Sequence, residues 1–168
     1  MAVDIAAARG LNLPIIYNTS TYDRVETLRL LDGVVAIYLP DVKFTDPATA
    51  KKYTFATDYA EVAFDGIREM HRQVGDLRID GNGRAMKGLL VRNLVLPEDL
   101  GGTSRLVRFL RDEISQDTWI NVLGSYAPPA HLAESPPLNR RPTRDEYLNA
   151  LRHARDAGLH LLGEDSGL

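Results

Sequence analysis

Arg92 is the residue whose setting points most clearly to chemistry. It interrupts an apolar run over residues 89–96, which stops at Pro97, and such a run predicts a parallel strand buried on both faces. A guanidinium inside a strand of this kind has to pair with a carboxylate or meet an anionic ligand. The residues alone favour the ion pair and leave the ligand as the alternative.

Asp41 and Lys43 form a second polar pair that could contact a ligand. They follow the apolar residues 34–39, and because they are two positions apart they face the same side of an extended backbone. Parallel α/β folds bind ligands at the carboxyl ends of their strands, which is where this pair stands. The alternative is a local ion pair between the two side chains, which would contribute little energy.

The elements that would position these residues recur in a fixed order. Buried strands are expected over residues 13–17, 34–39, 89–96 and 119–123, each followed by a polar loop and a helical pattern. This order predicts an α/β fold with about four parallel strands. We also expect a β-hairpin at the turn Asp80-Gly81-Asn82-Gly83, inserted before the strand at 89, and helices over residues 1–9, 46–52 and 58–74.

Three further helices have recognisable first residues. Asp23 with Glu26, and Thr143 with Glu146, have the spacing of a capping box, and Thr103 after two glycines is typical of an N-cap. The proline-rich residues 127–142 predict a long loop before the last helix, and such loops are usually functional or disordered. Residues 159–162 could add a short strand, and residues 163–168 are expected to be a flexible tail.

Length and composition exclude several classes of function. The 168 residues fit one domain, 1–168, and the net charge of −3 gives no reason to expect nucleic acid as a partner. Neither an apolar run long enough for a membrane span nor a basic signal-peptide region is present, so we expect a cytoplasmic protein with no membrane contact. The absence of cysteine removes disulfides and cysteine-held iron–sulfur clusters from the chain's own chemistry, and four scattered histidines give no metal-ligand pattern.

Several stretches taken together match one family pattern: NLPIIYNTSTYD, LLDGVVAIYLPDVKF, MHRQVG with the DGNG turn, KGLLVRNLVLPEDLGGT, WINVLGSYAPP and PLNRRPTRDEY. They resemble the C-terminal portion of radical S-adenosylmethionine (radical SAM) proteins related to pyruvate formate-lyase activating enzyme. The resemblance covers nearly the whole chain. It implies strands three to six of a partial, TIM-like (β/α)6 barrel.

The resemblance also implies what the chain lacks. The family holds a 4Fe-4S cluster with a CxxxCxxC loop, contacts the cofactor with a GGE motif, and cleaves S-adenosylmethionine reductively to a 5′-deoxyadenosyl radical. Neither motif is present here. We therefore expect a fragment that is inactive alone and binds S-adenosylmethionine weakly or not at all, with the cluster present only in the full-length family protein.

Residues can be carried over only for the later strands. The resemblance implies no catalytic and no metal-binding residue in this chain, but it implies cofactor contacts for Asn18, Thr19, Asp41, Lys43, Arg92 and Tyr126. It further implies a substrate-facing segment formed by Asn139, Arg140 and Arg141.

Two partners are expected on this basis. One is an N-terminal half that carries the CxxxCxxC and GGE motifs. The other is a second copy of the chain, because the strand over residues 13–17 would lack its neighbour and expose its edge. The alternative function is a non-catalytic α/β binding module, or a split-gene subunit that completes its fold with another chain.

Overall fold

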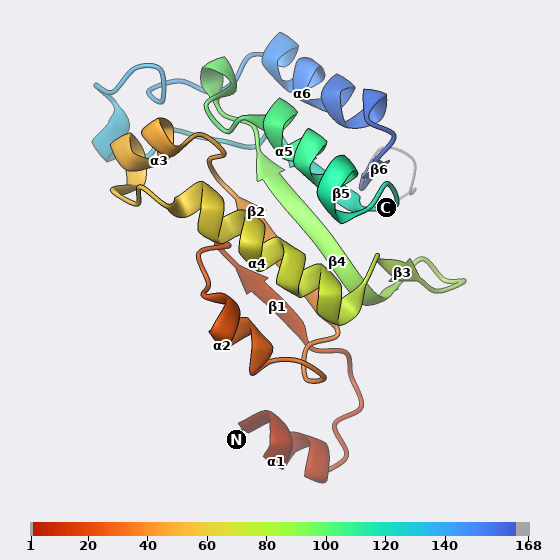
Figure 1. Cartoon of the computed structure of the whole chain (residues 1–168). Coiled ribbons are helices and arrows are strands. Elements are labelled where there is room, and N and C mark those ends of the chain that lie inside the picture. Colours follow the sequence, from red (N-terminus) through yellow and green to blue (C-terminus); the bar gives the residue numbers. More distant parts are fainter. Residues whose placement is uncertain (1, 164–168) are drawn as a thin grey trace.

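The computed structural model describes residues 2–163, in which five parallel strands form one sheet whose order follows the chain (Figure 1). The strands are β1 (Ile16–Thr19), β2 (Ile37–Val42), β4 (Ala85–Leu94), β5 (Trp119–Leu123) and β6 (His160–Leu161). A short strand, β3 (Arg78–Ile79), pairs antiparallel with the start of β4 and forms the predicted hairpin. The predicted α/β fold with a parallel sheet is confirmed. The tail expected over residues 163–168 lies outside the described residues beyond Gly163.

The helices connect these strands. They are α1 (Ala2–Ala8), α2 (Val25–Arg29), α3 (Pro47–Thr54), α4 (Tyr59–Val74), α5 (Thr103–Phe109), which continues in a π-helical turn over Leu110–Ile114, and α6 (Arg144–Asp156). Short 3₁₀ turns cover Pro97–Asp99 and Ala130–Leu132. Within the described part of the chain, every helix falls short of the length and apolar character needed to cross a lipid bilayer.

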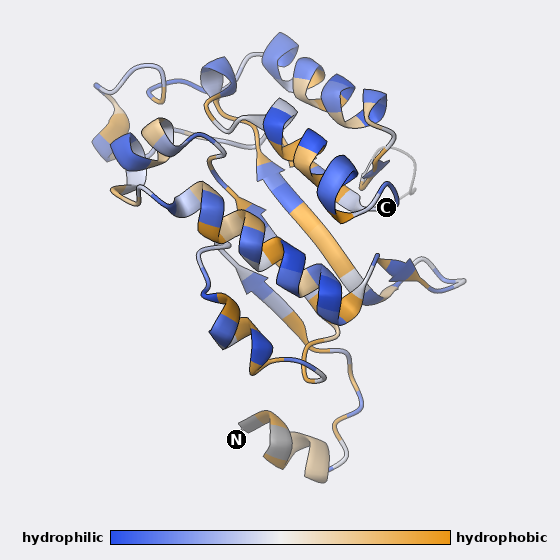
Figure 2. Ribbon diagram, in the orientation of Figure 1, coloured by the Kyte–Doolittle hydropathy of each residue, from blue (hydrophilic) through white to orange (hydrophobic). Residues whose placement is uncertain are grey.

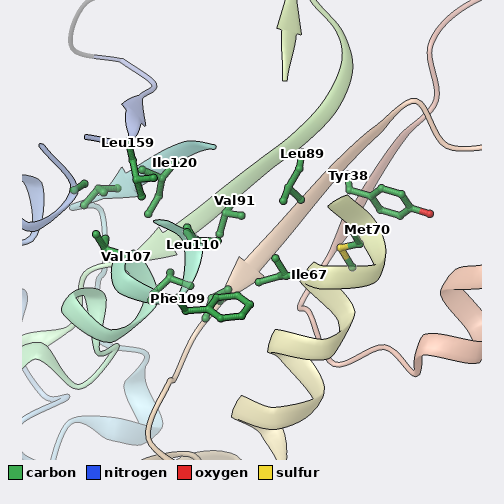
Figure 3. Close-up of a cluster of buried hydrophobic side chains, with 14 of the residues drawn as sticks. Tyr38, Ile67, Met70, Leu89, Val91, Val107, Phe109, Leu110, Ile120 and Leu159 are labelled. Atoms are coloured by element: carbon green, nitrogen blue, oxygen red, sulfur yellow. The ribbon is translucent and has the colours of Figure 1, made fainter. Parts of the chain in front are cut away.

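One face of the sheet packs against α2, α4, α5 and α6. Its core contains fully buried strand residues such as Tyr38, Leu89 and Ile120, which meet Ile67 and Met70 of α4 (Figure 3). Hydrophobic and hydrophilic positions are interspersed along the helices (Figure 2), and in α4 the buried Ile67, Met70 and Val74 form a stripe that belongs to this core. Burying these stripes against the apolar strands is the main favourable contribution to the stability of a fold of this kind.

The other face of the sheet has a smaller apolar cluster. Ile37, Leu77 and Leu90 form its buried centre, and among the described residues none of its members comes from a helix. Parallel strands joined in chain order by right-handed crossovers place all their helices on one face, which explains the asymmetry. Side chains of β2 and β4 that alternate away from the helices therefore point to a sparsely covered surface.

Several strand predictions need correction. Residues 13–17 were expected to form a buried strand, but β1 begins at Ile16, a residue that is 57% exposed. The reason is that β1 is at the edge of the sheet and pairs with β2 alone among the described strands. β2 begins three residues later than predicted and includes Asp41. The second arm of the hairpin and the central strand, which were expected to be separate, form one strand, β4. Gly88 at φ 128° makes this possible, because a Cβ at this position would collide with the backbone of Asp76 and Leu77.

Two of the predicted helix caps are wrong. Asp23 does not cap α2, because its carboxylate accepts hydrogen bonds from Thr19 Oγ1 and, at 3.0 Å, from Tyr17 Oη. Gly102 at φ 65°, rather than Thr103, is the N-cap of α5, and the Thr103 hydroxyl donates to the buried Asn93 at 2.7 Å. Both side chains take tertiary partners that the local pattern does not show. The capping box at the start of α6 is confirmed.

Candidate functional site

A pocket of about 290 Å³ opens at the carboxyl ends of β2, β4 and β5. Its far side is formed by α3 and by the loop around Ala130–Leu132, which lie side by side at the upper left of Figure 1. Much of the wall is apolar, with Phe44, Leu94, Leu96, Leu123, Leu132 and Leu138 among its residues. Asp41, Lys43 and Arg92 add charge on the strand side. The site therefore has an apolar body and a polar wall.

The sheet register explains why the three charged residues meet. Asp41 of β2 and Arg92 of β4 are paired residues in neighbouring parallel strands. Val42 and Asn93 follow them in the same register and are buried toward the helices. Because side chains alternate along a strand, the residues beside Val42 and Asn93 point to the open face of the sheet. Lys43, one residue beyond Val42, shares that face and stays exposed.

Arg92 is paired within the protein. Its Nε and Nη2 atoms donate to the two carboxylate oxygens of Asp41, with Nη2 2.8 Å from Oδ2. Nη2 also donates to Asn18 Oδ1 at 3.1 Å. The ion pair anticipated for Arg92 is thus formed, and its partner is Asp41, so the predicted alternative of an Asp41–Lys43 pair does not occur.

Two cationic donors nevertheless remain at the pocket. Nη1 of Arg92 makes no hydrogen bond, and the ammonium of Lys43 has no ion-pair partner, among residues 2–163. Lys43 and Arg92 against Asp41 leave the polar wall with one net positive charge. A wall of this kind favours an anionic group on a ligand.

Asn18 and Thr19 are neighbours in β1, so their side chains point to opposite faces of the sheet. Asn18 reaches Arg92 across the open face of the sheet. The Thr19 hydroxyl is on the helix side, where it donates to Asp23. The structure therefore brings Asn18 to the site and leaves the side chain of Thr19 away from it.

Tyr126 holds the loop that closes the pocket. Its hydroxyl donates to the carbonyl oxygen of Leu138 at 2.7 Å, and burial raises the pKa of the phenol. Leu138 is only 3% exposed and packs with Phe44 and Leu96 in an apolar cluster that contributes to the pocket wall. The proline-rich loop is thus anchored at Leu138.

The segment Asn139, Arg140 and Arg141 is not on the pocket wall. Arg140 donates through both terminal nitrogens to Glu146 of α6, at 2.8 Å for each contact. Glu146 also accepts the backbone N–H groups of Thr143, at 2.6 Å, and of Glu98, at 2.8 Å. The carboxylate therefore ties the start of α6 to two loops. A contact of this segment with a substrate stays a prediction.

Glu146→Gln is expected to lower the free energy of unfolding at pH 7 by about 2 kcal/mol, because a carboxylate that accepts four charged or backbone donors becomes a neutral amide. Pairing with Arg140 holds the pKa of Glu146 well below its usual range. Since the folded-state pKa is depressed, the contribution is complete above the unfolded-state pKa of about 4.3 and is lost as the pH falls below it.

Urea unfolding of both proteins between pH 7 and pH 3 checks this expectation. The difference between wild type and Glu146→Gln should be constant above pH about 5.5 and should shrink below about 4.3. Asp145→Asn is the control, because it removes a charge in the same helical turn from a side chain with no hydrogen bond among the described residues. A difference that did not vary with pH would contradict the role given to Glu146.

Sequence reasoning missed the apolar part of the pocket. Phe44 stacks on Tyr53 of α3 with their ring centroids 6.0 Å apart, and both line the site with Leu132 of the distant loop. The unusual length of the loop was the available signal, but its contact with α3 is not a local property. No group of His, Asp or Glu side chains in the described region is arranged to hold a metal ion.

No protein-family model matches the chain. The uncharacterized protein MJ0674 of Methanocaldococcus jannaschii is 30% identical over 152 residues, which are 90% of this chain and 40% of that protein. The chain therefore spans less than half the length of the relative that it matches.

Proposed function

We propose that this chain is the C-terminal part of a radical SAM protein related to pyruvate formate-lyase activating enzyme, and that its pocket binds part of S-adenosylmethionine. One observation carries the proposal. Asp41, Lys43 and Arg92, which the sequence resemblance assigns to the cofactor, all line one pocket at the carboxyl ends of parallel strands. Asn18 accepts a hydrogen bond from Arg92, and Tyr126 also lines the pocket.

The winding of the sheet supports the partial-barrel part of the proposal. The strand order β1-β2-β4-β5-β6 contains no reversal, and the helix-bearing core lies on one face. Doubly wound sheets reverse their strand order and carry helices on both faces, whereas barrel-type sheets wind in chain order with helices outside. The concave inner surface of such a barrel would be the face that holds Arg92.

The residues present fit the carboxylate end of the cofactor. Lys43 and Nη1 of Arg92 are free to donate to an anion, and Asp41 offers a carboxylate to an ammonium group. The volume of about 290 Å³ is at the lower limit for sites that enclose a drug-sized ligand, so part of the cofactor would extend outside. Arg92 is already paired with Asp41, so the binding free energy that it gains from an additional anion is smaller. Binding to this chain alone should therefore be weak.

The residues present do not fit the 4Fe-4S cluster. Iron–sulfur clusters are held mainly by cysteine thiolates, and the chain contains no cysteine. Reductive cleavage is chemistry that the cluster and the cofactor supply together in intact relatives. The part assigned to this chain is to bind and orient the cofactor's carboxylate end.

A second candidate is a non-catalytic α/β binding module or a split-gene subunit. The specific observation in its favour is the edge strand β1, which pairs on one side only among the described strands and exposes Ile16. A subunit that gains its missing neighbour from another chain would have such an edge.

Titration with S-adenosylmethionine, followed by two-dimensional NMR of the ¹⁵N-labelled chain, tests the proposal. We expect saturable shifts at Lys43, Arg92 and Tyr126 with a dissociation constant in the millimolar range. Methionine amide, which lacks the carboxylate, should shift the same signals far less than methionine. An unchanged spectrum at saturating cofactor, or shifts confined to residues outside the pocket, would refute the proposal.

A further inference from the structure

Tyr59, the first residue of α4, is not on the pocket wall, yet its hydroxyl lies between the two strand ends that carry the polar residues. The hydroxyl oxygen accepts the backbone N–H of Lys43 at 3.0 Å. It donates to the carbonyl oxygen of Ser20 at 2.9 Å, and the carbonyl of Asp41 is 3.2 Å away. One helix side chain thus joins the end of β1 to the end of β2.

The hydrogen bonds of the Tyr59 hydroxyl begin where the backbone pairing between β1 and β2 ends. The last paired residues of β1 and β2 are Thr19 and Pro40, and Ser20 and Asp41 come next along each strand. The Tyr59 hydroxyl takes the place of the next rung, because it bonds to the backbone of both strands. Lys43 lies beyond the end of β2, so a side chain rather than a neighbouring strand accepts its N–H.

The ring of Tyr59 is held on two sides. Its residue is 4% exposed, and it stacks on Tyr22 with centroids 5.7 Å apart. It also meets Phe44 edge-on at 6.4 Å, and Phe44 is itself on the pocket wall. Burial raises the pKa of Tyr59 to about 12, so the hydroxyl keeps its proton at neutral pH. The donor and the acceptor contacts are both available under ordinary conditions.

We propose that Tyr59 is a positioning residue of the pocket, which holds the backbone at Asp41 and Lys43 so that the Lys43 ammonium faces an anionic ligand. The inference rests on the proposed function, since it takes the pocket to be a ligand site. Val42 is anchored in the core between the two residues, so rotation of the backbone after Val42 is the movement that would turn Lys43 away. The bond from the Lys43 N–H to Tyr59 restrains this rotation.

Hydrogen exchange at the Lys43 amide tests the hydrogen bond between Lys43 and Tyr59 in the absence of any ligand. In the wild type this amide should be protected, although its residue is exposed and lies beyond the strand. In Tyr59→Phe the acceptor is gone, and exchange should be about tenfold faster or more. Unprotected exchange in the wild type would overturn the inference whether or not the variant folds.

Tyr38→Phe is the matched control. Tyr38 is also fully buried, its pKa is likewise raised to about 12, and its hydroxyl donates to Gln73 at 2.6 Å. It lies on β2 but bonds to α4 rather than to the strand ends. This variant should lose a similar amount of thermal stability and leave the Lys43 amide unchanged.

Titration of the same two variants with S-adenosylmethionine separates a positioning role from a merely structural one. Tyr59→Phe should weaken binding about tenfold, and Tyr38→Phe should stay within about twofold of the wild type. Equal losses in both variants would assign Tyr59 a structural role only and overturn the inference. If the wild type itself fails to bind S-adenosylmethionine, the proposed function is wrong. Hydrogen exchange at the Lys43 amide still decides whether the hydrogen bond to Tyr59 exists.

Discussion

Replacing Arg92 by Gln is expected to remove S-adenosylmethionine binding and to destabilise the fold at the same time. Arg92 and Asp41 are 27% and 34% exposed at their side chains, so the pair is half-buried. Without the guanidinium, the Asp41 carboxylate keeps its charge and loses its partner. We expect the free energy of unfolding to fall by about 1–2 kcal/mol, below the roughly 3–5 kcal/mol found when a fully buried pair is broken.

Binding should fall by at least about tenfold, because the charge-assisted hydrogen bond to the cofactor's carboxylate is lost. The double variant Asp41→Asn/Arg92→Gln separates the two effects, since it replaces the ion pair with two neutral amides. Its stability in urea should return close to that of the wild type, whereas its binding should not. Binding restored along with stability would show that the charge of Arg92 does not hold the ligand.

The isolated chain is expected to self-associate through β1. Among the described strands this one pairs only with β2, and Leu13 and Ile16 beside its open edge are 71% and 57% exposed. An open edge next to apolar side chains recruits other strands. Light scattering during size-exclusion chromatography should show oligomers that grow with concentration. Ile16→Lys should suppress them, and Leu30→Lys, at an 80% exposed position just after α2, should not.

Co-expression with an N-terminal half that carries the CxxxCxxC and GGE motifs should replace the oligomers with a soluble one-to-one complex. Because the thiolates belong to that half, the complex should be brown after anaerobic reconstitution with iron and sulfide, and the isolated chain should remain colourless. A stable monomer at high concentration, with strong amide-exchange protection through residues 13–17 and β1, would contradict the prediction. It would mean that the edge is closed by other means.

Local sequence patterns predict the structure reliably where the deciding contacts are also local. The capping box of Thr143 and Glu146 was predicted correctly because both partners are within one turn. Asp23 and Glu26 have the same spacing, but Asp23 takes hydroxyl partners from β1 and leaves α2 uncapped. The difference lies in tertiary neighbours, which spacing does not encode.

Burial of a strand is likewise not decided by its own residues, as a comparison of β4 with β1 shows. An apolar run correctly indicated the interior of β4, whose residues Leu89 and Val91 are fully buried. The apolar run over residues 13–17 instead leads into β1, the exposed edge strand of the sheet. Its burial depends on how many neighbours a strand has, and that is a property of the sheet as a whole.

The α/β class, the positions of most elements, the lack of cluster ligands and the placement of polar residues after strands can all be read from the sequence. Which of these residues contact one another depends on the tertiary structure. Asp41 and Arg92 are 51 positions apart and become partners only through the register of β2 with β4. The Tyr59 hydroxyl reaches Ser20 across 39 positions for the same kind of reason. Strand register and helix docking follow from the packing of the whole chain, so no short stretch of sequence contains them.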